Sequence, residues 1–199
     1  MTPSFDVDHK LCYISNIVII RIEGAKQAFS SLLLEREFIY NMETTSELSK
    51  LYLSEALIQL MKTKDFAKIT NKNITDRAGL SHITIYRHFD TKEEILSYYL
   101  ARMFKQWKED WQEGENMAYQ FFTFFQRHQE IIDLLYRAGQ QYLLIEQLLA
   151  CYDYCREDSP ALAYSKVTVA YLIFGWCDEW YKRGMVETPE EMAKLCQLR

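Results

Sequence analysis

Apolar residues recur with the period of an α-helix from residue 46 onward. Leu53, Ala56, Leu57, Leu60 and Met61 stand at i, i+3, i+4, i+7 and i+8, which places them on one face of a helix. The chain has only 6 glycines and 3 prolines, too few for the many tight turns of a β-sandwich. The pattern therefore predicts an all-α fold. Further helices are expected over residues 118–127, 130–137, 140–154 and 159–183, with a last one beginning at Thr188.

Two short helices joined by a tight turn are predicted between residues 70 and 89. Thr70 is a good N-cap for the first helix, and Gly79 suits the left-handed residue that ends it. Ser81 caps the second helix, which turns Ile85 and Phe89 inward. A capping box at residues 91–94 then starts a longer helix that reaches about residue 112. This order predicts a helix-turn-helix, whose second helix presents its outward side chains to the major groove of DNA.

The outward face of the second short helix carries the side chains suited to DNA. Arg87 can donate two hydrogen bonds to a guanine, and Ile83 or Thr84 can pack on a thymine methyl group. Tyrosine, histidine and lysine side chains, and the amides at the start of the first short helix, are better placed for phosphates. The candidate DNA-contacting residues are Thr70, Asn71, Lys72, Ser81, His82, Ile83, Thr84, Tyr86, Arg87, His88 and Lys92.

The charge distribution along the chain supports such a contact. The formal net charge is −5, but residues 62–92 hold seven basic and three acidic residues, a local charge of +4. Residues 93–199 have a net charge of −6. A basic island on an acidic body can contact phosphate without making the whole protein a non-specific polycation.

The residues of this segment also match a known family pattern. Residues 69–96 have the sequence ITNKNITDRAGLSHITIYRHFDTKEEIL, with an Ala-Gly-Leu-Ser turn, a Tyr-Arg-His-Phe motif and a Lys-Glu pair in register. This stretch resembles the DNA-binding signature of TetR/AcrR regulators, and the resemblance covers about residues 48–98. It implies a DNA-binding transcription regulator in the cytoplasm. The family pattern further implies a repressor that a small molecule or another signal releases from its operator.

Three positions depart from the family pattern. Asn71 stands where an apolar residue usually packs, Thr75 where alanine is common, and Ile83 where the residue is often small. Ile83 either packs on a thymine methyl or hinders close approach to the DNA. The alternative hypothesis is therefore an adaptor of the same fold that has lost DNA binding and acts through protein–protein contacts. A third class, a plain ligand-binding bundle, would show no salt-dependent DNA affinity.

The resemblance implies that residues 93–199 form an effector-binding and dimerising domain after a DNA-binding domain at 42–92. The many aromatic residues of this region suit a hydrophobic core or a pocket for a small apolar or aromatic effector. The helix over 159–183 is apolar nearly all round between Val167 and Cys177, so a second subunit is expected to cover it. This helix and the last one are expected to form a symmetric four-helix interface. A homodimer would place two recognition helices roughly 34–36 Å apart on a pseudo-palindrome in double-stranded DNA. The candidate pocket residues are Phe121, Phe125, Tyr142, Tyr171 and Phe174, and the candidate interface residues are Val167, Tyr171, Phe174 and Cys177.

Several protein classes are not expected from this sequence. No apolar run approaches the ~20 residues of a membrane span, and five irregularly spaced cysteines fit a reducing cytosol. No nucleophile–base pattern, phosphate-binding glycine loop or metal-ligand spacing occurs, so we expect no enzymatic activity, no cofactor and no metal. Residues 1–41 lack a sustained helical period. We expect this segment to be a dispensable extension or the product of a start assigned too early, with Met42 as the natural start.

Overall fold

The computed structural model describes residues 45–110 and 116–196. The chain divides into two compact units, Met1–Leu48 and Ser49–Arg199, and nearly all described residues belong to the second. The hypotheses about residues 1–41, and the expected end of a helix at residue 112, lie outside the described residues.

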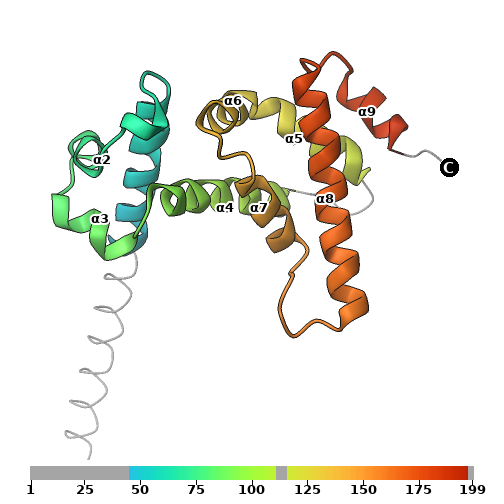
Figure 1. Ribbon diagram of the computed structural model, residues 1–199, viewed down its shortest axis with the longest axis horizontal. Coiled ribbons are helices and arrows are strands. Elements are labelled where there is room, and N and C mark those ends of the chain that lie inside the picture. Colours follow the sequence, from blue (N-terminus) through green and yellow to red (C-terminus); the bar gives the residue numbers. More distant parts are fainter. Residues whose placement is uncertain (1–44, 111–115, 197–199) are drawn as a thin grey trace, which may run out of the picture. The chain divides into compact units, whose positions relative to one another are not determined.

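Every regular element in the described residues is a helix, which confirms the predicted all-α class (Figure 1). None of these helices combines the length and apolar character needed to cross a membrane. After a helix over residues 45–61, the elements are η1 (Phe66–Lys68), α2 (Asn71–Ala78), α3 (His82–His88), α4 (Lys92–Asp110), α5 (Met117–Arg127), α6 (Gln129–Ala138), α7 (Leu143–Cys151), α8 (Pro160–Lys182) and α9 (Pro189–Leu195).

Local sequence signals set most helix boundaries as predicted. The Thr70 hydroxyl accepts a hydrogen bond from the N–H of Asn73, whose side chain in turn accepts one from the N–H of Thr70. This reciprocal capping box satisfies two amides that the start of α2 would otherwise leave unpaired. Gly79 ends α2 with φ of +68°, a conformation that glycine adopts without steric cost. At the start of α8, the Ser159 hydroxyl accepts a hydrogen bond from the N–H of Leu162. Thr188 and Glu191 form a second reciprocal capping box at the start of α9, and a proline follows the cap of both helices.

Two predicted boundaries differ in detail. The Thr91 hydroxyl accepts a bond from the N–H of Glu94, but the Glu94 carboxylate reaches back to the N–H of Asp90 instead of Thr91. Helix α7 is shorter than the predicted 140–154, because its flanking residues form turns. Asp153 in the second turn has φ of +50°, which a continuing α-helix does not allow.

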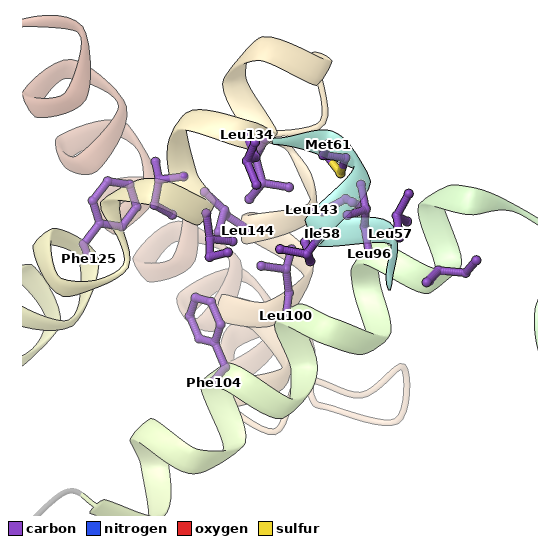
Figure 2. Close-up of a cluster of buried hydrophobic side chains, with 14 of the residues drawn as sticks. Leu57, Ile58, Met61, Leu96, Leu100, Phe104, Phe125, Leu134, Leu143 and Leu144 are labelled. Atoms are coloured by element: carbon purple, nitrogen blue, oxygen red, sulfur yellow. The ribbon is translucent and has the colours of Figure 1, made fainter. Parts of the chain in front are cut away.

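One contiguous hydrophobic core joins the helix-turn-helix to the helices that follow it. Figure 2 shows Leu57 and Met61 from the helix over 45–61 close to Leu96 and Leu100 of α4. Farther along α4, Phe104 is buried in the same cluster. Helix α4 therefore packs at its start with the helix-turn-helix and the helix ahead of it, and at its far end with the rest of the bundle.

Candidate nucleic-acid interface

The two short helices are held together by buried apolar residues and a satisfied polar one. Ile74 of α2 and Ile85 of α3 are 0% and 1% exposed, and Phe89 is buried just after α3. Thr75 is also buried, but its hydroxyl donates within α2 to the carbonyls of Asn71 and Lys72, at 3.1 and 3.2 Å. Because this hydroxyl is hydrogen-bonded, threonine is accommodated where a small apolar residue is expected.

Helix α3 presents one face to solvent, and the burial of Ile85 and Phe89 confirms the orientation predicted from the sequence. His82, Ile83, Tyr86 and Arg87 are all exposed. Ile83 and Tyr86 are 64% and 57% exposed, high values for large apolar side chains. An exposed cluster that joins a cation, an aromatic ring and an aliphatic side chain can meet both base edges and phosphates.

Two of these exposed side chains contact each other. The rings of His82 and Tyr86 lie one helical turn apart, with centroids 5.2 Å apart and planes at 87°. The Tyr86 hydroxyl is 3.4 Å from Nε2 of His82. This edge-to-face contact restricts both side chains on the outward face, so less conformational entropy is lost when they bind a partner.

Thr84 and His88 lie to the side of this exposed face. Both are half-buried. The Thr84 hydroxyl is 2.8 Å from the hydroxyl of Ser81, and the His88 ring makes an edge contact with Phe89 at 6.5 Å. The Thr84 hydroxyl thus contributes to the start of α3, where the Ser81 side chain makes no cap bond to the backbone.

Lys92, one of the candidate phosphate ligands, makes contacts inside the protein. Its Nζ donates to the carbonyl oxygens of Phe66 and Ile69, at 2.7 and 2.9 Å, and lies 4.5 Å from the centroid of the Phe66 ring. Two of its three N–H donors are therefore committed to the segment ahead of α2. Sequence reasoning missed this role, since no local pattern connects residues 23 and 26 positions apart.

The start of α2 lies in a basic part of the chain. Thr70 and Lys72 are exposed, and Asn71 is half-buried. The capping box already uses the N–H groups of Thr70 and Asn73, and Lys64 donates to the side chain of Asn73 at 2.9 Å. A phosphate at this helix start would therefore meet the amides of Asn71 and Lys72 together with a nearby ammonium group.

An apolar cavity lies within the bundle. It has a volume of about 350 Å³ and lies among α4, α5, α7 and α8, and of the five candidate pocket residues only Phe121 lines it. Phe125 is 2% exposed and packs on Trp180 in the core, and Tyr142 is exposed. Helical spacing identifies an apolar face but not the helix that will cover it, so spacing alone cannot tell which of these residues line the cavity. The cavity is lined by Trp107, Lys108, Ala118, Phe121, Phe122, Leu148, Cys151, Tyr152, Val169, Leu172, Ile173, Trp176 and Cys196.

The candidate interface residues on α8 fall on more than one face of that helix. Cys177 is 2% exposed and belongs to the hydrophobic core of the chain, so its side chain is not available to a partner. Val167 and Phe174 are half-buried, and Tyr171 is 55% exposed. The large apolar side chains that α8 does expose are Leu162, Tyr164, Val169, Tyr171 and Leu172.

Comparison with known proteins identifies the N-terminal region. Residues 53–99, which run from the first described helix through α2 and α3 into α4, match the model of the tetR family of bacterial regulatory proteins. The protein Lin0861 from Listeria innocua has a similar solved structure, with a TM-score of 0.62 over 77% of this chain and 90% of that one. The two sequences are 14% identical, so this likeness concerns the fold. No curated protein matches the chain significantly.

Proposed function

Because the chain belongs to the tetR family of bacterial regulatory proteins, we propose that it binds a specific operator sequence through α3 and represses transcription there. The observation that carries this proposal is the exposed cluster on α3, formed by His82, Ile83, Tyr86 and Arg87. These side chains lie opposite the buried Ile85. A recognition helix needs this separation between a face that packs and a face that contacts bases.

Each residue of the proposed interface has a role that follows from its chemistry. The Arg87 guanidinium donates to a guanine edge, and Ile83 packs on a thymine methyl group. Tyr86 and His82, which contact each other, bind the phosphate backbone beside α3. Asn71 and Lys72 bind a phosphate at the start of α2. We propose no catalytic role for the chain.

A second copy of the chain is the proposed partner of α8, within a domain that spans residues 93–199. Tyr164, Thr168, Tyr171 and Gly175 are all exposed and lie on one side of this helix. Glycine inside a helix costs roughly 0.5–1 kcal/mol relative to alanine. A Cβ atom at Gly175 would meet nothing within 4 Å, so packing within the protomer does not require glycine there. Close approach of a second α8 would require it, and this supports a homodimer on a pseudo-palindromic operator.

Release from the operator is proposed to act through α4. Lys92 in its first turn holds the segment ahead of α2, and Trp107 near its far end lines the apolar cavity. An effector that fits only one position of α4 would shift the population between DNA-binding and released states. In a cytoplasmic regulator this would couple the level of a small molecule to transcription.

Titration of DNA onto the purified full-length protein tests the proposal. Genomic fragments retained by the protein are selected, and the best duplex is titrated by fluorescence anisotropy at two salt concentrations. We expect tight binding that weakens with salt, exceeds that of a scrambled duplex, and is lost in Tyr86→Ala. A matched Tyr142→Ala variant, altered at an exposed tyrosine outside the helix-turn-helix, should bind normally. If no fragment is enriched, the adaptor function, with Ile83 blocking the DNA surface, replaces this proposal.

A further inference from the structure

The cavity among α4, α5, α7 and α8 has the size and walls of a small-molecule site. Its volume of about 350 Å³ lies within the usual range for ligand pockets. Five aromatic side chains line it: Trp107, Phe121, Phe122 and Trp176 from three different helices, and Tyr152 just after α7. Trp107 and Phe121 already pack edge to face at 5.6 Å, so the wall presents both ring faces and ring edges. Such walls suit flat rings, which gain stacking and edge contacts in addition to burial.

The polar groups of the cavity do not favour a charged ligand. Its one charged lining residue, Lys108, directs its Nζ toward the carbonyl of Cys151 at 3.3 Å and the carboxylate of Asp153 at 3.4 Å. Burial raises the pKa of the Cys151 and Cys196 thiols, which keeps both neutral. A charged ligand would lose its hydration without gaining a full counter-charge. The cavity therefore selects a neutral occupant.

Part of the cavity wall reaches the surface of α8 next to the side assigned to the second copy. Val169 and Leu172 line the cavity and are 38% and 58% exposed. Leu172 and Trp176 also line a groove between α8 and α9, together with Tyr171 and Gly175. The same two side chains thus form the wall of the cavity and the floor of the groove. A helix laid in that groove would cover the exposed side of the cavity wall.

We propose that this cavity binds a neutral ligand built of aromatic rings, and that a second copy of the chain, docked on the outer face of α8, covers the exposed part of its wall. The coupling rests on the dimer of the proposed function, whereas the ligand class rests on the cavity alone. Ligand binding and self-association are then linked. If dimerisation raises the affinity for the ligand by a given factor, then ligand binding raises the affinity of the two copies for each other by the same factor.

Phenylnaphthylamine, a neutral two-ring dye that fluoresces in apolar surroundings, is the probe for the ligand class. We expect it to bind the full-length protein at least about tenfold more tightly than anilinonaphthalene sulfonate, the same ring system with one negative charge. Ala118→Phe, which fills the cavity, should abolish binding, whereas Ala150→Phe, at an exposed site on α7 outside the lining, should not. Equal affinity for the two dyes overturns the neutral class. Binding that survives Ala118→Phe overturns the site.

Gly175→Tyr tests the coupling, because residue 175 lines the groove but not the cavity. Sedimentation should show that this variant is a monomer, and circular dichroism should show that its helicity is unchanged. The Kd of phenylnaphthylamine should rise at least about tenfold. In the wild-type protein, the dye should tighten self-association by the same factor. A monomeric variant that binds the dye normally overturns the coupling. A variant that stays dimeric overturns the assigned interface, while DNA titration of the wild-type protein separately tests the regulator function.

Discussion

Lys92 holds Phe66 in two ways at once. Its Nζ donates to the main-chain carbonyl of Phe66 at 2.7 Å and lies 4.5 Å from the centroid of the same residue's ring. The ammonium also donates to the carbonyl of Ile69, directly before the cap of α2. The start of α4 is thereby fixed to the start of α2. Because α3 lies between α2 and α4 in the chain, this contact helps to fix the position of α3.

We expect Lys92→Met to destabilise the protein. The substitution keeps the apolar stem but leaves two half-buried carbonyls without their charged donor, which costs about 1–3 kcal/mol. Urea unfolding followed by circular dichroism measures this loss in the free energy of unfolding. Lys68→Met is the matched control. Its ion pair with Asp65 is exposed at both ends, so this substitution should leave the free energy of unfolding nearly unchanged. Equal effects in the two variants would contradict the role assigned to Lys92.

Arg87→Ala should weaken operator binding by about 1–3 kcal/mol and relax specificity at one base pair. Arg87→Lys should restore little of this, since an ammonium group cannot make the two parallel hydrogen bonds of a guanidinium. Anisotropy titrations with the operator and its single-base variants measure both effects. Lys72→Ala provides the contrast, with a similar loss for every sequence and a smaller salt dependence. A uniform loss in Arg87→Ala would instead make Arg87 a phosphate ligand.

The sequence predicted those features that depend on residues within one helical turn. The cap at Thr70, the left-handed Gly79 and the inward side of α3 each follow from side chains at most four positions apart. The outward placement of His82, Ile83, Tyr86 and Arg87 then follows from the helical period, once the buried residues are known. The all-α class and the location of the helix-turn-helix therefore needed no long-range information.

Contacts between distant parts of the chain were beyond such reasoning. Phe121 and Phe125 are equivalent by spacing, yet one lines the cavity and the other packs on Trp180, because different helices cover them. Tyr136 stacks on Tyr181 at 3.9 Å and donates to Asp178 at 2.7 Å, across more than forty positions. Burial of this hydroxyl and its bond to Asp178 raise the pKa of Tyr136. Only the packing of α6 on α8 creates that environment.

His128 should make the stability of the protein depend on pH. Burial, and to a smaller degree the nearby Arg127, lowers the pKa of this imidazole below its ordinary value of 6.5. The unfolded chain therefore binds the proton at a higher pH than the folded one, so stability is full above about pH 6.5 and falls as the pH drops toward the folded pKa. Urea midpoints between about pH 7 and pH 5 should decline less in His128→Gln than in the wild-type protein. Identical slopes would assign the pH dependence to other groups.

The role of Ile83 distinguishes two hypotheses for the exposed face of α3. Its side chain either contacts a thymine methyl group or prevents close approach to DNA. This apolar side chain is 64% exposed, so contact with a thymine methyl group in place of water is favourable. Removing that methyl, by replacing thymine with uracil at each operator position in turn, should weaken binding at one position by about 1 kcal/mol. In Ile83→Ala the same replacement should cost almost nothing, because the two groups form one contact and their losses do not add. Anisotropy titrations of both proteins on both duplexes complete this cycle. Tighter binding by Ile83→Ala on the thymine operator would show that the side chain hinders approach, and would favour the adaptor function.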